Sequence, residues 1–501
     1  MENLLMGFQV ALTLENLLYS LIGVFFGNLV GVIPGIGAMA AISMLLPMTY
    51  SLPPTGALMM LAGIYYGTSY GGAITAIMLN LPGVPTHAVA CLDGYPLARQ
   101  GKAGKALLMT MVASFLGAST GILLMTAFGP VMVAIAFKFT PMEYFSLMAL
   151  GLLAASMLSV GSPVKGIFMV LLGLLLGVVG TDITSGVPRF TFGLPGLMDG
   201  LVLVAVAMGF YGISEVFQNV DKLKRGEKTT SENIGFRSLR LPWAKLKACI
   251  PSIARGTGVG SFVGVLPGVG GAISSFMAYA VEKNCSKNPE RFGRGALEGV
   301  ASSEAANSAA AQTSFIPTLS LGIPGDAVMA LMLAAMMIHN IQPGPQMMIS
   351  HPTIFWGLIA SFWIGNVMLL MLNIPLIGIW TRLLSIPYRF IFPAILLFVC
   401  VGVFSANNSM FDVKVVLLLG VLGYVLSALR FEPAPLLLGV VLGPMVEENF
   451  RRSLLLSNGD LSVFITRPIS GACVLIGALM IIGLVISQIR KRRGRSAMAP
   501  A

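Results

Sequence analysis

The sequence predicts an all-α polytopic membrane protein with two inverted repeats that contain broken helices or re-entrant hairpins. At roughly 20 apolar residues per crossing, it predicts about 10–12 transmembrane helices. The first basis is composition: of 501 residues, 56% are hydrophobic and 10% are charged, whereas a soluble domain has roughly 25% charged residues. The second is a pair of Pro-Gly motifs that recurs in both halves of the chain. The composition excludes an ordinary soluble enzyme.

The first half consists of apolar stretches separated by Pro, Gly or charged residues. They lie near residues 16–36, 37–52, 55–80, 104–136, 143–160, 164–181 and 196–219. The longest polar run follows at 221–247, with eight Lys or Arg residues and three acidic ones. We therefore assign 1–220 to a first membrane repeat and 221–247 to a basic linker.

The second half shows the same kind of pattern, although several of its stretches are too short or too polar to span a membrane alone. The stretches lie near 250–281, 298–320, 326–340, 353–380, 387–404, 413–430, 433–446 and 469–489. We assign 248–468 to a second membrane repeat. Residues 469–501 form a final transmembrane helix and a basic tail.

Charge is distributed as in an oriented membrane protein. The formal net charge of +11 comes largely from clusters in the linker and in the tail, where five basic residues lie between 490 and 495. Basic loops remain cytoplasmic, so we expect the linker and the C-terminus inside, lipid as the surroundings and no nucleic acid as a partner. No basic residue precedes Arg99, which indicates an outside N-terminus and hence inverted repeats.

Two motifs recur in the same order in the two halves. GVIPGIG at 31–37 reappears 233 residues later as GVLPGVGG at 264–271, and Leu-Pro-Gly at 81–83 is matched 242 residues later by Ile-Pro-Gly at 323–325. An ordered pair of repeated motifs indicates an internal repeat. Inverted repeats of this kind are common among secondary transporters.

The Pro-Gly pairs are expected to interrupt helices, because Pro removes a backbone donor and disfavours helix in the preceding residue. Within a bilayer such a break is tolerated where protein or a water-filled cavity satisfies the backbone. Each helix that restarts presents free N–H groups, worth about 0.3–2 kcal/mol to an anion. Four breaks predict one lined cavity with an anion site; the alternative is tight turns and small-residue packing.

The expected substrate-binding residues lie in and beside these breaks. They are Pro34, Gly35, Gly37, Tyr70, Gly71, Gly72, Asn80, Pro82, Gly83, Pro267, Gly268, Gly270, Thr313, Pro324 and Gly325.

Ionisable residues in apolar surroundings indicate a second kind of site, since charge within a bilayer is costly and often functional. Helical spacing places Glu304, Asn307 and Ser308 on one face, where they are candidates to hold Na⁺ or to carry a proton. The alternative is a capping or helix-packing hydrogen bond. His87 is either a proton relay or, as we expect, an interfacial residue, and Asp93 is expected in a turn.

No catalytic or metal centre is predicted. The three His and five Cys residues are scattered, and no CxxC pair, phosphate loop, Gly-x-Ser-x-Gly elbow or HExxH motif is present. We expect no enzyme activity and no cofactor other than a coupling ion. Asp182 and Arg189 are expected to form a structural ion pair.

Several long runs resemble the TctA family. They are GVIPGIG (31–37), YGGAITAIMLNLPG (70–83), LDGYPLARQGKAGKAL (92–107), GTDITSGVPRFTFG (180–193), GVLPGVGG (264–271), EGVASSEAANSAAA (298–311) and the run at 442–470. The resemblance implies the large membrane subunit of a bacterial tripartite tricarboxylate transporter. It also implies a small membrane subunit (TctB), a periplasmic substrate-binding protein (TctC), carboxylate import on an ion gradient, and location in the inner membrane.

The resemblance further implies that all four Pro-Gly loops belong to the transport site. Two departures from the family pattern put the substrate in doubt: Gln312-Thr313 stand where relatives carry Gly-Gly, and Asp326 adds a carboxylate after the last Pro-Gly pair. Tricarboxylates, dicarboxylates and aromatic acids all remain open. The alternatives in function are a stand-alone carboxylate carrier or channel and, less favoured, a membrane-embedded enzyme.

Overall fold

The computed structural model describes residues 2–33, 37–81, 85–158, 162–182, 185–214, 216–218, 234–235, 238–266, 270–384 and 388–497. Within them the chain is almost entirely helical, and the only β structure is one antiparallel pair of two-residue strands. The predicted all-α fold is therefore confirmed. The chain divides into two compact units, Met1–Ala136 with Leu201–Leu429 and Phe137–Gly200 with Arg430–Ala501.

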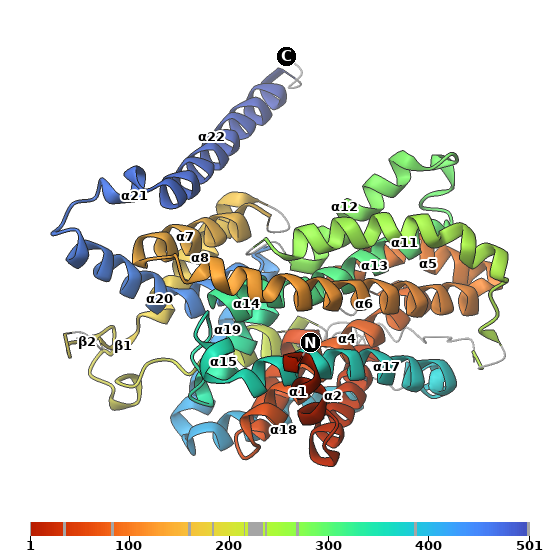
Figure 1. Ribbon diagram of the computed structural model, residues 1–501, viewed down its shortest axis with the longest axis horizontal. Coiled ribbons are helices and arrows are strands. Elements are labelled where there is room, and N and C mark those ends of the chain that lie inside the picture. The colour runs from red at the N-terminus through yellow and green to blue at the C-terminus, as the bar shows by residue number, and fades with distance from the viewer. Residues whose placement is uncertain are drawn as a thin grey trace. The chain divides into compact units, whose positions relative to one another are not determined.

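The first unit begins with eight elements that lead to one long helix (Figure 1). They are α1 (Glu2–Ala11), α2 (Leu14–Val32), α3 (Ala38–Leu45), η1 (Leu46–Thr49), α4 (Pro54–Leu79), η2 (Pro85–His87), α5 (Ala88–Leu97) and η3 (Ala98–Lys102), followed by α6 (Ala103–Ala136).

The same unit resumes after residue 200. Its later elements are α9 (Leu203–Ala207), η5 (Met208–Ile213), α11 (Trp243–Gly264), α12 (Gly270–Cys285), η7 (Pro289–Arg291), α13 (Leu297–Thr313), α14 (Phe315–Leu321), α15 (Ala327–Ile338), α16 (Met347–Ser350), α17 (Pro352–Leu383), α18 (Tyr388–Asn407) and α19 (Met410–Ala428).

The second unit is smaller. It contains α7 (Pro141–Leu158), α8 (Pro163–Gly177), β1 (Gly180–Thr181), β2 (Pro188–Arg189), η4 (Pro195–Leu197), α20 (Ala434–Leu456), α21 (Val463–Thr466) and α22 (Pro468–Ala497). In it α20 packs against α7 and α8, and α22 packs against α7.

Helix ends lie on both sides of every Pro-Gly pair, as predicted. In the first half α2 ends at Val32 before α3, and α4 ends at Leu79 before η2; in the second half α11 ends at Gly264 before α12, and α14 ends at Leu321 before α15. Three of the pairs, at 34–35, 82–83 and 267–268, lie outside the described residues. The fourth, at 324–325, is described and is non-helical.

Two central helices, α4 and α13, are buried on nearly every side. A helix with apolar or small side chains on every face is typical of a protein interior. Each has a neighbour with a glycine at every fourth position: α2 packs on α4 through Gly23, Gly27 and Gly31, and α11 packs on α13 through Gly256, Gly260 and Gly264. The two glycine sets are 233 residues apart, which matches the repeat offset.

These glycines are required by close approach of the backbones. A methyl group at Gly31 would lie 2.5 Å from the Thr68 carbonyl oxygen, and one at Gly260 would lie 2.6 Å from Ala306 Cα. Either separation is too short for any larger side chain.

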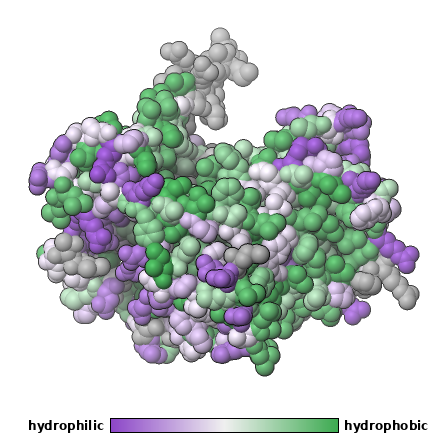
Figure 2. Space-filling view, in the orientation of Figure 1, coloured by the Kyte–Doolittle hydropathy of each residue, from purple (hydrophilic) through white to green (hydrophobic). Residues whose placement is uncertain are grey.

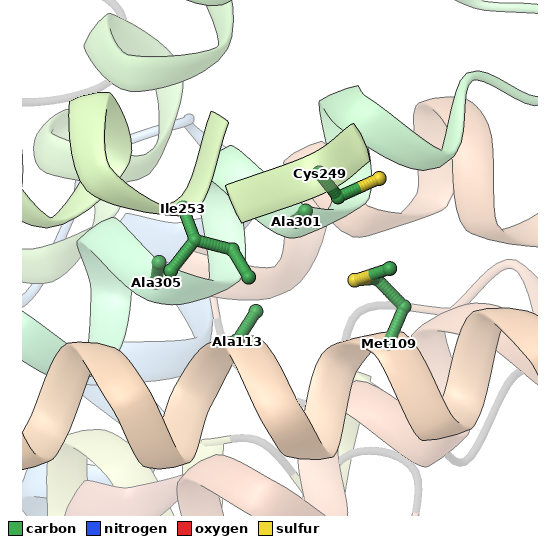
Figure 3. Packing of buried hydrophobic residues seen from close by; sticks show 6 residues of the cluster. All are labelled: Met109, Ala113, Cys249, Ile253, Ala301 and Ala305. Atoms are coloured by element: carbon green, nitrogen blue, oxygen red, sulfur yellow. The ribbon is translucent and has the colours of Figure 1, made fainter. Parts of the chain in front are cut away.

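Helices α6, α11 and α13 lie side by side in the first unit (Figure 1). Small side chains on α13 allow the larger ones of its neighbours to meet. Figure 3 shows the resulting apolar cluster, in which Met109 and Ala113 from α6 face Cys249 and Ile253 from α11 and Ala301 and Ala305 from α13.

The chain is a multi-pass membrane protein. Within the described residues, five helices are long and apolar enough to cross a membrane: Leu14–Val32, Ala88–Ala136, Pro352–Leu383, Met410–Ala428 and Pro468–Ile486. Shorter apolar helices include Ala327–Ile338 and Pro163–Gly177. Large exposed apolar side chains follow these helices, for example Leu418 on α19 and Leu475 on α22, and broad hydrophobic areas cover the surface shown in Figure 2. Contact with lipid explains why these large apolar side chains are exposed.

Candidate functional site

The flanks of the four helix breaks approach one another within the first unit. Helix α3 contacts both α4 and α15, and α12 contacts η2. At the start of α12, a methyl group on Gly270 would lie 3.4 Å from Asp326 Cβ, and one on Gly271 would lie 2.8 Å from Asn307 Oδ1 and 3.2 Å from Thr86 Cγ2. Residues beside three different breaks therefore meet near α13.

The helices that lead into the second break of each half end in the same way. Asn80 terminates α4 with φ 57°, and Gly322 terminates α14 with φ 69°. The two residues are 242 positions apart, which is the offset of the repeated Pro-Gly motif. A left-handed residue at this position is a common helix C-terminus, so the repeat extends to local backbone conformation.

Asp326 occupies the helix end that follows the fourth break. Its Oδ1 accepts a hydrogen bond from the Met329 N–H at 2.8 Å, and its Oδ2 accepts one from the Tyr65 hydroxyl at 3.3 Å. Asp326 is thus the N-cap of α15, a role that carboxylates fill well. The α15 N-terminus is thus already capped by a carboxyl group of the chain itself. By contrast, the N-cap of α3 is Gly37, which makes no side-chain capping bond.

Several expected substrate-binding residues lie outside the described part of the chain. These are Pro34, Gly35, Pro82, Gly83, Pro267 and Gly268. Of the described ones, Gly37 precedes α3, Gly270 begins α12, and Pro324 and Gly325 lie between α14 and α15. Their role in binding stays a prediction.

The remaining expected residues also have packing roles. The Tyr70 hydroxyl donates to Asn366 Oδ1 at 3.3 Å, and Thr313 Oγ1 donates to the Ala309 carbonyl oxygen at 3.1 Å. Gly71 lies against the α2 backbone, and Gly72 is buried within α4. These contacts agree with the packing alternative and leave a substrate role untested.

Polar side chains to which the sequence assigned no role connect helices of the first unit. The Tyr66 hydroxyl donates to Gln312 Oε1 at 2.8 Å, which links α4 to α13. Asn366 on α17 donates to Ser119 Oγ at 3.0 Å and to the Phe115 carbonyl oxygen at 3.2 Å. Gln312, which departs from the family pattern, therefore supplies a hydrogen-bond acceptor for the buried Tyr66 hydroxyl. The only sequence signal was the presence of amides in apolar stretches.

Glu304 lies in the middle of α13 and is 1% exposed, so it caps no helix end. Its Oε1 is 3.0 Å from Nδ1 of His87, which is 0% exposed. On the next turn Asn307 Nδ2 donates to Ser69 Oγ at 3.0 Å. Ser308 is also buried. The predicted polar face of Glu304, Asn307 and Ser308 therefore lies inside the protein, and His87, which we expected at the interface, lies against it.

The expectation that Asp93 is a turn residue is wrong, because Asp93 lies within α5 and is 0% exposed. Its Oδ1 accepts from the N–H groups of Gly293, Gly295 and Ala296, each at 2.8 Å. Its Oδ2 accepts from the Tyr279 hydroxyl at 2.8 Å. A single carboxylate thus holds the segment that leads into α13.

The predicted ion pair between Asp182 and Arg189 is confirmed in the second unit, with 3.8 Å between Oδ1 and Nη2. It belongs to a larger network: Arg451 Nη1 is 2.9 Å from Asp182 Oδ2, and Glu447 Oε1 is 2.7 Å from Arg189 Nη1. Two of the runs that resemble the TctA family, at 180–193 and 442–470, therefore meet through charges. The ion-pair network gives the charged residues of these two runs a structural role.

Among the described residues, no group of three or more His, Cys, Asp or Glu side chains is placed to hold a metal ion. The buried polar side chains in this part of the chain include no Lys or Arg. His87 is their one basic side chain.

Comparison with known proteins identifies the family. Residues 17–438 match the family described as "Tripartite tricarboxylate transporter TctA family". The chain is 46% identical over 497 residues to a protein of Agrobacterium vitis, with 99% of this chain and 98% of that protein covered. That relative is named "Uncharacterized 52.8 kDa protein in TAR-I ttuC' 3'region".

A second Agrobacterium vitis protein, named "Uncharacterized protein in TAR-II ttuC' 3'region", is 53% identical over 234 residues, which are 47% of this chain and 97% of that protein. No solved structure matches the chain. From the family match and the full-length relative, we conclude that the chain belongs to the TctA family of tripartite tricarboxylate transporters.

Proposed function

We propose that the chain is the large membrane subunit of a bacterial tripartite transporter that imports carboxylates across the inner membrane. In this proposal a periplasmic binding protein delivers the substrate, a small membrane subunit completes the membrane complex, and the basic C-terminus lies in the cytoplasm. Family membership supports the class of protein. The observation that carries the site is the close approach, near α13, of residues that flank the helix breaks.

The substrate carboxylate would bind at helix N-termini next to the breaks. The starts of α3 and α12 are the best candidates, because α3 lacks a capping side chain and α12 begins at Gly270. The start of α15 is less suitable, since Asp326 already accepts its Met329 N–H. Each available helix end contributes about 0.3–2 kcal/mol toward holding a negative charge. Binding of this strength also permits release.

Transport would follow alternating access between the two repeats, which we infer to be inverted. The close pairs α2–α4 and α11–α13 are bound by backbone contact at glycines and are expected to move as rigid bodies. A coupling ion would supply energy of about 2.3 kcal/mol per charge for each 100 mV of membrane potential.

The coupling ion would bind on α13, at Glu304, Asn307 and Ser308. All three are buried. Two of them lie against residues that follow the breaks: Glu304 is 3.0 Å from His87, and Asn307 Oδ1 would lie 2.8 Å from a methyl group on Gly271. Both Na⁺ and a proton are compatible with this set of groups, since carboxylate and amide oxygens hold hard cations and a carboxylate also takes up a proton.

Uptake measurements in proteoliposomes test the proposal. The vesicles would contain this chain alone, or this chain with its small membrane subunit and binding protein, and labelled citrate, succinate and benzoate would be the probes. We expect uptake of at least one acid only in the complete assembly. Full activity of the chain alone would contradict the tripartite proposal and support a stand-alone carrier.

A matched pair of glycine substitutions tests the site itself. Gly270→Ala is expected to abolish uptake, because Gly270 has φ 69° and begins α12 beside Asp326. Gly258→Ala on α11 is the control, since a methyl group there has no heavy atom within 4 Å. Equal uptake by the two variants would contradict the placement of the substrate at the α12 N-terminus.

A further inference from the structure

A buried glutamate and a buried histidine connect the two halves of the chain within the first unit. His87 is the last residue of η2, directly after the second break of the first half, and Glu304 lies in the middle of α13 in the second half. Their Nδ1 and Oε1 atoms are 3.0 Å apart, and the two side chains are 1% and 2% exposed. The other polar atom of each, His87 Nε2 and Glu304 Oε2, has no hydrogen-bond partner among the described residues.

We propose that His87 and Glu304 form the proton-carrying pair of the transporter, so that the coupling ion is a proton. The inference rests on the function proposed above and names the ion and one further residue of the coupling site. One proton from the outer solution binds to the pair, on Glu304 Oε2 or His87 Nε2. The same proton leaves to the cytoplasm when the repeats change conformation, and no other group is consumed.

The chemistry of the pair favours a proton over Na⁺. A hard cation prefers several oxygen ligands, whereas imidazole nitrogen suits softer metals. One oxygen of Glu304 is already bound by the imidazole nitrogen, and a protonated His87 would repel a metal ion. Asn307 Nδ2, one turn further along α13, donates to Ser69. A carboxylate and an imidazole in hydrogen-bond contact form an efficient acid–base pair.

The location of the pair links protonation to conformation. A deprotonated Glu304 with a neutral His87 leaves a negative charge in the protein interior, which is costly unless it is paired. Protonation removes that cost and also changes the contact between η2 and α13. Because η2 follows a helix break, the position of His87 is expected to differ between the two orientations of the transporter.

Few other titratable groups compete for this proton. Tyr70 on α4 and Cys91 on α5 interact electrostatically with Glu304. Titratable side chains on other elements packed against α13 make contacts of their own: Cys249 of α11 lies in an apolar cluster, Asp93 of α5 accepts from Tyr279 of α12, and Arg255 of α11 pairs with Glu282 of α12. Helix α6 contributes no titratable side chain at the contact with Ala305, the residue after Glu304, because the residue of α6 there is Gly117.

The test separates exchange from accumulation in proteoliposomes that contain the complete assembly. Counterflow, in which labelled citrate, succinate or benzoate exchanges for the unlabelled acid at equal pH, needs no net proton movement. Accumulation is then driven by an inward proton gradient, with a pH indicator outside. We expect Glu304→Gln and His87→Gln to lose at least about tenfold more in accumulation than in counterflow, because an amide cannot take up the proton that a positioned acid–base group transfers.

Glu298→Gln is the matched control, because it makes the same change on α13 at a partly exposed residue that pairs with Arg291. It is expected to accumulate substrate as the wild type does. Wild-type uptake should make the outer solution alkaline.

Two results would overturn the inference. One is wild-type accumulation driven by a Na⁺ gradient without proton movement, and the other is unchanged proton-driven accumulation in both pair variants. If the wild-type assembly shows no counterflow with any of the acids, the proposed function fails instead. The two failures are therefore distinguishable.

Discussion

Replacing Asp93 with Asn is expected to destabilise the segment that leads into α13. One oxygen of Asp93 accepts three backbone N–H groups at 2.8 Å each, and the other accepts the Tyr279 hydroxyl at 2.8 Å. The N–H donors come from residues 293, 295 and 296. Gln100 Nε2 also donates to the Arg294 carbonyl oxygen at 3.0 Å, but Asp93 makes four of the hydrogen bonds that hold the segment and its donor Tyr279.

The size of the effect follows from these bonds. A hydrogen bond to a charged acceptor contributes about 1 kcal/mol more than one to a neutral acceptor. Asn keeps one carbonyl oxygen but loses the charge, so three backbone bonds together lose about 3 kcal/mol. The Asn amide is able to donate to the Tyr279 oxygen, so that contact changes little. Tyr279→Phe removes only one bond and is expected to cost about 1 kcal/mol.

Two measurements check the prediction in detergent-solubilised protein. Unfolding followed by intrinsic fluorescence should show the loss of about 3 kcal/mol for Asp93→Asn and the smaller loss for Tyr279→Phe. Limited trypsin digestion should cleave after Arg291 and Arg294 faster in the Asn variant, because local opening exposes them. Wild-type stability together with wild-type cleavage in Asp93→Asn would refute the anchoring role.

Three further predictions concern packing and charge. Gly260→Leu should prevent stable folding by separating α11 from α13, while Gly258→Leu, with open space around it, should fold normally; similar yields of monodisperse protein would contradict this. Tyr66→Phe should lower the free energy of unfolding by about 1 kcal/mol or more, because the hydrogen bond is lost and the buried Gln312 is left without its partner. An unchanged melting curve would argue against the Tyr66–Gln312 hydrogen bond. Glu447→Gln should lower the melting temperature at low salt by breaking contacts with two arginines, and the difference should shrink as NaCl is raised; a salt-independent difference would be inconsistent with an ionic origin.

Much of the fold is predictable from short segments. Composition and apolar stretches predict an all-α membrane protein, and Pro-Gly pairs predict where helices end, because proline and glycine act on the backbone of their immediate neighbours. The same local logic fails at Asp93. A Leu-Asp-Gly-Tyr segment is typical of a turn, but here the Asp lies inside α5 and accepts from donors about 200 residues away.

The sequence by itself therefore determines the membrane environment, the helices, their breaks and the repeat, since these depend on hydropathy and on local backbone preference. Tertiary structure alone decides which buried polar groups meet. His87 and Glu304 are 217 residues apart, and Tyr70 and Asn366 are 296 apart, so no local pattern connects them. Their pairing results from the close approach of helices, which follows from side-chain volume at every crossing and from the need of each buried polar group for a partner.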